Sequence, residues 1–216
     1  MARNDMGLVL AAQTKSFRLR KQLKKIKEQQ GIAKDVFLIG STGCNTFANP
    51  ESDLHHVIQN CREAKIMLLN PFAEGACLRA KSIPDPDITL EHFREQIIKS
   101  VDFLKNLKVL QKNIQLKLYE EPPLFKLLVL GDYLFMKYYH SGLNVQEMPE
   151  YIFRHSANHS SLFHPLYQVF LSKWRDPTIP EYDFDTDELV YRDNSGNEVK
   201  REGLAETTFN AACVKC

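Results

Sequence analysis

The sequence of 216 residues has one tryptophan, five cysteines and a net charge of only +1. Lys and Arg (28) nearly cancel Asp and Glu (27), so the overall field is weak and does not by itself indicate a nucleic-acid partner. An odd number of scattered cysteines is typical of reduced thiols rather than of a disulfide framework. We therefore expect a cytoplasmic protein.

Long hydrophobic runs are also missing. The longest apolar stretches, such as 125–131, contain a charge (Lys126) and fall far short of the roughly 20 residues that span a bilayer. The apolar run 6–12 is too short for the hydrophobic region of an export signal and is preceded by an acidic residue, Asp5. We expect no export signal and no membrane insertion.

Cofactor and metal motifs are missing as well. The loop 40–46 has neither the Lys-Ser/Thr pair of a P-loop nor the glycine spacing of a dinucleotide turn. Cys213 and Cys216 make half of a zinc site, and His155 and His159 have helical metal spacing in a Ser/Asn-rich stretch. We interpret the cysteine pair as part of a frayed tail, and we expect neither a cofactor nor a metal.

What is present is a composition that can form a core, with 44% hydrophobic and 25% charged residues. Short apolar runs at 35–40, 65–70 and 114–119 predict strands, and periodic segments at 16–30, 53–64, 88–107 and 160–174 predict helices. Strand, helix and strand in succession indicate a βαβ unit with parallel strands. We expect a basic helix in 1–33, an α/β domain with a mixed sheet flanked by helices in 34–176, and an irregular acidic extension in 177–216.

The ends of the chain carry opposite charges. Residues 15–27 hold seven basic side chains, whereas 181–206 hold nine acidic and three basic ones. The basic helix either contacts phosphate backbone or a membrane surface, or is a solvated face or one docked on the acidic segment. We favour a solvated helix face or a face docked on the acidic segment.

A β-hairpin is predicted where 124–130 and 133–139 flank Gly131-Asp132. A two-residue turn there places Lys126 directly opposite Lys137. Like charges in that position repel unless an anion or a carboxylate lies between them, and a phosphate is a candidate. The loop after the first strand, with Ser41 and Thr42, is a second candidate, because ligands of open α/β sheets bind beyond the carboxyl ends of strands.

The order of elements, together with residues 125–144, resembles one half of the phospholipase D superfamily. The family motif is His-x-Lys-x4-Asp on a hairpin, followed by a Gly-Ser-x-Asn turn. Lys126 matches the motif lysine, Asp132 falls one residue late, and the run from Ser141 to Asn144 approximates the turn. Leu124 stands where the family has its nucleophilic histidine.

The resemblance implies phosphate binding by Lys126 and Asn144, with Ser141 beside them, and pairing of two halves in a homodimer. His140 is the candidate for a displaced nucleophile or acid-base group, so we take His140 and Lys126 as the catalytic candidates. Lys137, Asn144, Ser141, Ser41 and Thr42 are the candidate ligand residues. The expected ligand is a nucleotide, a nucleic acid or another phosphodiester, with weak hydrolysis possible; the alternative is a catalytically inactive sensing or protein-interaction module.

Overall fold

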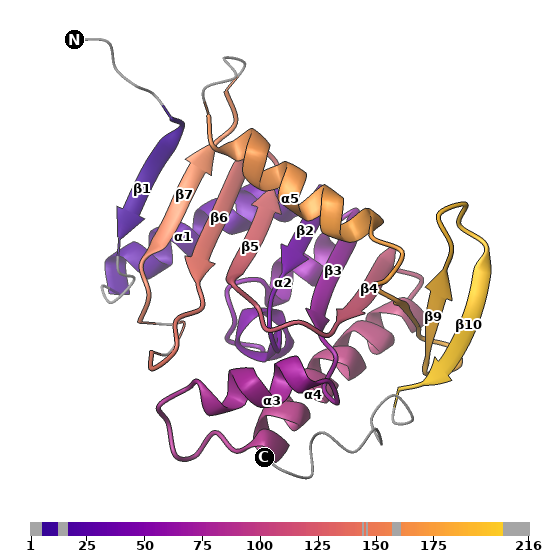
Figure 1. Ribbon diagram of the computed structural model, residues 1–216. Helices are drawn as coiled ribbons and strands as arrows, with labels where there is room; N and C mark the ends of the chain where they lie inside the picture. Colours follow the sequence, from indigo (N-terminus) through magenta and orange to yellow (C-terminus); the bar gives the residue numbers. More distant parts are fainter. Residues whose placement is uncertain (1–5, 13–16, 144, 146, 157–160, 205–216) are drawn as a thin grey trace.

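The structure is a computed structural model that describes residues 6–12, 17–143, 145, 147–156 and 161–204. It is built around one sheet of ten strands in the order β1-β7-β6-β5-β2-β3-β4-β8-β9-β10 (Figure 1). The strands are Leu8–Ala12 (β1), Asp35–Ile39 (β2), Glu63–Leu69 (β3), Ile114–Tyr119 (β4), Phe125–Leu130 (β5), Tyr133–Tyr138 (β6), Glu150–Arg154 (β7), Glu181–Asp183 (β8), Glu188–Arg192 (β9) and Glu198–Gly203 (β10). The helices are Phe17–Gly31 (α1), the π-helix Cys44–Ala48 (η1), His55–Asn60 (α2), Glu74–Lys81 (α3), Leu90–Val109 (α4) and Phe163–Arg175 (α5).

The centre of the sheet is parallel. β2 pairs with β3 and β3 pairs with β4 in parallel register, and helices connect these strands. Strands covered on both faces need continuous apolar runs, and Ile66 to Leu69 of β3 are all fully buried. The prediction of an α/β protein with a mixed sheet flanked by helices is confirmed.

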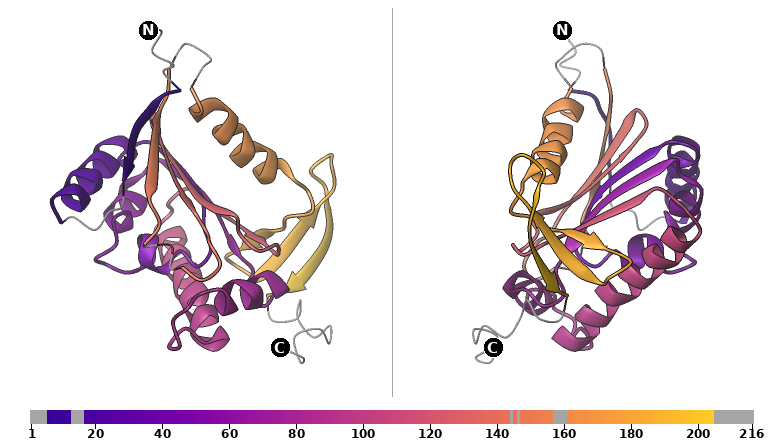
Figure 2. Two further views of the ribbon diagram at one scale, coloured as in Figure 1. Left: turned by 60° about the vertical axis from the view of Figure 1, so that its left-hand side comes forward. Right: turned by 90° about the vertical axis from the view of Figure 1, so that its right-hand side faces the viewer.

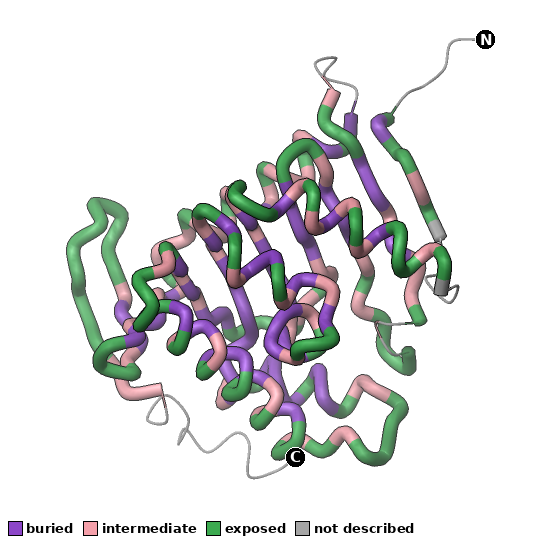
Figure 3. Tube along the Cα trace, turned by 180° about the vertical axis from the view of Figure 1, so that it is seen from behind, coloured by how far each residue is buried: buried purple, intermediate pink, exposed green. Residues whose placement is uncertain are grey.

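The helices form two layers (Figure 2). α5 covers one face of the sheet, whereas α1, α2 and α4 lie on the other, which Figure 3 shows from behind. α4 turns an apolar stripe toward the core, with Phe93, Ile97 and Leu104 buried. Its first turn is capped by the Thr89 hydroxyl, which accepts a hydrogen bond from the backbone N–H of His92.

The predicted hairpin register is confirmed. β5 and β6 pair so that Lys126 lies opposite Lys137 and Phe125 opposite Tyr138. Gly131 occupies the turn with φ 52°, and a Cβ there would come within 2.6 Å of the side-chain oxygen of Gln30. Both conditions favour glycine, because a positive φ is costly for residues with a Cβ.

The expected irregular extension after residue 177 is wrong for the part that is described. Residues 181–203 instead add three antiparallel strands to the sheet beyond β4. Leu189 is fully buried and Tyr182 nearly so. Lys105 of α4 pairs with Asp187 at 2.6 Å and joins the turn between β8 and β9 to the helix layer. The sequence pattern missed these strands because they are short and polar on their exposed side.

The other end of the sheet also differs from the prediction. The apolar segment Leu8–Ala12 forms β1, which pairs with β7, and neither strand was predicted. α1 follows β1 and lies at the opposite end of the sheet from the acidic strands, so among the described residues it is not docked on the acidic segment. Arg18, Lys21 and Lys25 are exposed, as a solvated face requires.

Within the described ranges, no helix combines the length and the apolar character needed to cross a bilayer.

Candidate functional site

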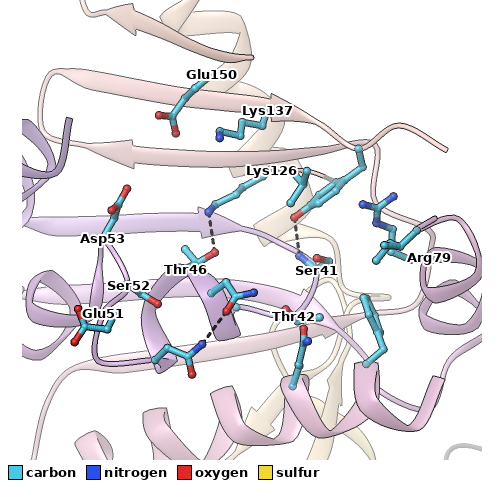
Figure 4. Close-up of a pocket in the computed structure, with 18 of the residues that line it drawn as sticks. Ser41, Thr42, Thr46, Glu51, Ser52, Asp53, Arg79, Lys126, Lys137 and Glu150 are labelled. Carbon is cyan, nitrogen blue, oxygen red and sulfur yellow. Dashed lines mark hydrogen bonds between the residues drawn. The ribbon is translucent and has the colours of Figure 1, made fainter. Parts of the chain in front are cut away.

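A cavity of about 370 Å³ lies beyond the carboxyl end of β2, between the loop that follows this strand and the β5–β6 hairpin. β5 returns antiparallel beside β2, while β3 lies on the other side of β2, so the strand order reverses at this point. Open α/β sheets bind ligands in the crevice beyond such a reversal. The cavity is lined from α1, the loop after β2, α3, α4 and the strands β5 to β7 (Figure 4).

The loop after β2 forms the floor of this cavity. Gly43 adopts φ 76°, and its carbonyl accepts backbone hydrogen bonds from Thr46 (2.8 Å) and Phe47 (2.9 Å), which start η1. A Cβ at Gly43 would come within 2.7 Å of the Phe47 ring, so the tight turn requires glycine. Phe47 is fully buried and anchors the loop. This geometry holds the Thr46 hydroxyl toward the hairpin.

Lys126 of β5 is the central cation of the cavity. Its ammonium donates a hydrogen bond of 2.7 Å to Oγ1 of Thr46. Burial, with a further contribution from the positive charge of Lys27, lowers the pKa of Lys126 to about 7. Among the described residues, no carboxylate forms an ion pair with Lys126. The carboxylates of Glu150 and Asp53 oppose this lowering of the pKa without pairing with Lys126, and a bound anion would act in the same direction.

Lys137 lies across the hairpin on the same face (Figure 4). Burial lowers its pKa, although the Glu150 carboxylate opposes that shift. The condition derived from the sequence, a carboxylate or anion close to the two lysines, is thus met in part by Glu150 of β7. The same carboxylate also pairs with a third lysine.

That third lysine is Lys27 of α1, which is only 5% exposed. Its ammonium lies 3.0 Å from Asp53 Oδ2 and 3.3 Å from Glu150 Oε1, and 5.2 Å from the centre of the Phe135 ring. Burial disfavours its charged form, but the two carboxylates outweigh burial and raise the pKa of Lys27. The group is therefore a buried cation held between two acids.

Arg79 of α3 lines the other end of the cavity, beyond Ser41 from Lys126 (Figure 4). Its guanidinium lies 4.7 Å from the centre of the Tyr139 ring and donates to Ser82 Oγ (2.8 Å) and to the backbone carbonyl of His140 (3.2 Å). The hydroxyl of Tyr139 in turn accepts a hydrogen bond from the backbone N–H of Ser41 (3.0 Å). Burial lowers the pKa of Arg79.

The candidate residues from the sequence divide into three groups. Ser41, Thr42, Lys126 and Lys137 all line the cavity. His140 and Ser141 are exposed and do not line it, and the carbonyl of His140 rather than its ring contacts Arg79. Asn144 lies outside the described residues.

Sequence reasoning missed Lys27, Asp53, Arg79 and Glu150, and it included Thr46 only as the end of the candidate loop 40–46. One signal was available for Lys27, which follows Leu19 and Leu23 at intervals of four and therefore falls on the apolar stripe of its helix. Glu150 and Arg79 carry no comparable signal, because each reaches the cavity through a tertiary contact. Strand β7, which holds Glu150, was itself not predicted.

The donor set of this site suits an anion. Its described residues combine lysine ammonium groups and the hydroxyls of Ser41, Thr42 and Thr46 with the carboxylates of Glu51, Asp53 and Glu150, and none of them is a histidine or a cysteine. In the part of the chain that the structure describes, no three His, Cys, Asp or Glu side chains gather as a metal site. Ammonium and hydroxyl groups are donors that phosphate oxygens accept from, whereas a histidine nucleophile is missing from the described lining of the cavity.

Comparisons with known proteins give little further information. No known family and no curated protein matches the sequence. Among solved structures, the chain is similar to TrmBL2, described as an archaeal chromatin protein with a novel mode of DNA binding, at a TM-score of 0.39 and 13% identity. The match covers 76% of this chain and 51% of the other, so this chain spans about half the length of that protein.

Proposed function

We propose that the protein is a phospholipase D-like domain that binds a phosphate-bearing ligand in the cavity between the β5–β6 hairpin and the loop after β2. The observation that carries this proposal is Lys126, a partly buried amine with a hydroxyl partner and, among the described residues, no paired carboxylate. Leaving such a group without a counter-charge is costly unless a ligand supplies one.

The surroundings of Lys126 support a phosphate as that ligand. Lys137 faces it across the hairpin, and the Thr46 and Ser41 hydroxyls come from the adjoining loop. Phosphate oxygens accept several charge-assisted hydrogen bonds at once, which a cluster of ammonium and hydroxyl donors provides. A cavity of about 370 Å³ also falls within the usual range for small-molecule sites, which favours a small phosphate ester over a polymer.

The resemblance to phospholipase D supports phosphate binding at Lys126, but it does not support hydrolysis. The lysine that matches the family motif lies in the cavity, on the hairpin where the family carries it. Leu124, at the position of the nucleophilic histidine, is 74% exposed, and His140 lies outside the cavity lining. We therefore propose binding as the main function, with phosphodiester hydrolysis slow or absent.

Titration calorimetry with inorganic phosphate and with AMP tests the proposal. Wild-type protein should bind both, and Lys126→Met should lose binding by at least tenfold, because a charge-assisted hydrogen bond contributes roughly 1.5–3 kcal/mol. Lys25→Met, which removes an exposed lysine of α1, serves as the matched control and should bind as the wild type does. Equal affinities for wild type and Lys126→Met would exclude the site.

A nucleic acid is a second candidate ligand, favoured by one observation. Arg20 of α1 lines the cavity, so the exposed cations of α1 continue to its entrance. A single-stranded oligonucleotide would then bind more tightly than AMP, with an affinity that falls steeply as salt is added. Equal affinity per phosphate at all salt concentrations would exclude this ligand.

The same proposal includes a homodimer, since single-motif members of the superfamily pair two halves. Light scattering at micromolar concentration measures the mass directly. A mass of one chain, 25.0 kDa, would remove the dimer from the proposal and leave the phosphate site in place.

A further inference from the structure

The Arg79 end of the cavity has a charge that nothing in the described structure balances. Arg79 is only 5% exposed, and its Nε is buried without a hydrogen-bond partner. Among the described residues it forms no ion pair, and its guanidinium lies 4.7 Å from the centre of the Tyr139 ring. Buried guanidinium groups are normally paired, since an unpaired charge in the interior is strongly unfavourable.

The contacts that Arg79 does make do not account for a guanidinium at this place. One of its terminal nitrogens donates to Ser82 Oγ and to the His140 carbonyl, and its plane lies over the Tyr139 ring. A neutral donor could serve the same two acceptors without the desolvation of a full charge. The positive charge itself therefore requires another explanation, and an anionic ligand group provides one.

The walls near Arg79 differ from those near Lys126. Ile83 and Ile88, from the segment between α3 and α4, line the cavity together with Phe93 and Gln96 of α4. Lys126 and Lys137 lie on the hairpin, and Ser41 lies between Lys126 and Arg79 (Figure 4). A ligand that reaches both ends would place an organic portion along the apolar wall and an anionic group at each end.

We infer that Arg79 forms a second anion-binding position in the cavity, so that the ligand is a small organic bis-anion with one phosphate at Lys126 and a second anionic group at Arg79. This inference rests on the proposed function, because it takes Lys126 as the first position. The planar, forked donors of arginine suit a phosphate or a carboxylate at the second position.

Two sugar phosphates that differ in one phosphate test the inference by titration calorimetry: fructose 6-phosphate and fructose 1,6-bisphosphate. Wild-type protein should bind the bisphosphate at least about tenfold more tightly, since the second phosphate gains charge-assisted hydrogen bonds. Arg79→Gln should bind both with the affinity of the monophosphate. Arg79→Lys, which keeps the charge, should recover part of the preference, and Arg94→Gln, outside the cavity, should retain all of it.

The outcomes separate this inference from the proposed function. Binding of the monophosphate with no preference for the bisphosphate, or a preference that survives in Arg79→Gln, would overturn the inference alone. Failure of both compounds to bind the wild type would overturn the proposed function with it. If Arg79→Gln does not fold, NMR of the wild type tests the inference instead. The measured signal is the Nε–H resonance of Arg79, which is assigned because it is absent from the spectrum of Arg79→Lys. This resonance should shift when the bisphosphate is added and should not shift with the monophosphate. A shift with the monophosphate alone, or no shift with the bisphosphate, would refute the second anion-binding position at Arg79.

Discussion

The ammonium of Lys126 on β5 donates a hydrogen bond of 2.7 Å to the hydroxyl of Thr46 in η1. This contact joins the hairpin to the loop after β2, two segments that are 80 residues apart in the chain. It fixes the position of the amine and leaves its charge without a carboxylate partner among the described residues. The first two predictions follow from this arrangement.

Thr46→Val removes the hydroxyl and keeps the shape of the side chain. The Lys126 amine then loses its acceptor, so we expect the affinity for inorganic phosphate to fall by about three- to tenfold as the amine loses its orientation. Calorimetry measures the affinity, and Thr178→Val, outside the cavity, is the matched control. Unchanged phosphate affinity in Thr46→Val would show that the contact does not orient the amine.

Anion binding should depend on pH through Lys126. With the pKa of Lys126 near 7, the free amine is mostly neutral above that pH, whereas a bound anion favours the ammonium. The affinity for sulfate, which does not titrate in this range, should therefore fall as pH rises from 7 to 9, by up to about tenfold per pH unit. Calorimetry in two buffers of different ionisation enthalpy should show proton uptake. A flat pH profile in the wild type would contradict the burial of this amine.

Lys126 should also affect stability. Its pKa in the folded protein lies below the unfolded value, so between about pH 7 and 10.5 the unfolded chain binds more protons and the free energy of unfolding rises with pH. Lys126→Met should lack this rise and, below pH 7, should be more stable than the wild type by on the order of 1 to 3 kcal/mol. Urea unfolding of the wild type and of Lys126→Met at pH 6 and pH 9 measures the rise with pH and the difference in stability. Destabilisation by Lys126→Met at pH 6 would assign the lysine a structural role.

Replacing Lys27 should destabilise the protein, in contrast to replacing Lys126. Lys27→Met removes the cation that pairs with the buried Glu150 and the half-buried Asp53, and breaking a buried pair in this way costs about 3–5 kcal/mol. Lys25→Met on the exposed side of the same helix should change stability by less than about 0.5 kcal/mol. Urea denaturation compares the two. Similar values for both variants would mean that the three-residue ion cluster contributes nothing.

The C-terminal strands should behave as part of the core. Leu189 is fully buried in β9, so Leu189→Ala should lower the free energy of unfolding by about 2–5 kcal/mol. Val199→Ala in β10, where the side chain is 62% exposed, should cost less than about 0.5 kcal/mol. A loss below 1 kcal/mol for Leu189→Ala would indicate that these strands unfold independently of the sheet.

The sequence by itself determined the parts of this protein that depend on neighbouring residues. Apolar runs and helical periodicity predicted β2, β3, β4 and α4 to within a few residues, because burial on both faces of a sheet leaves a local pattern. The turn at Gly131 fixed the pairing of Lys126 with Lys137, since a two-residue turn determines the register of a hairpin.

Only the tertiary structure decided which side chains meet. β1 and β7 are short strands that pair across more than 130 residues, and β8 to β10 are polar on one side, so none shows a sustained pattern. Glu150, Lys27 and Arg79 reach the cavity from three elements that no sequence spacing connects. The charges around Lys126, and with them its pKa, depend on burial and on distances through space. Those distances are set when the helix layer packs on the sheet.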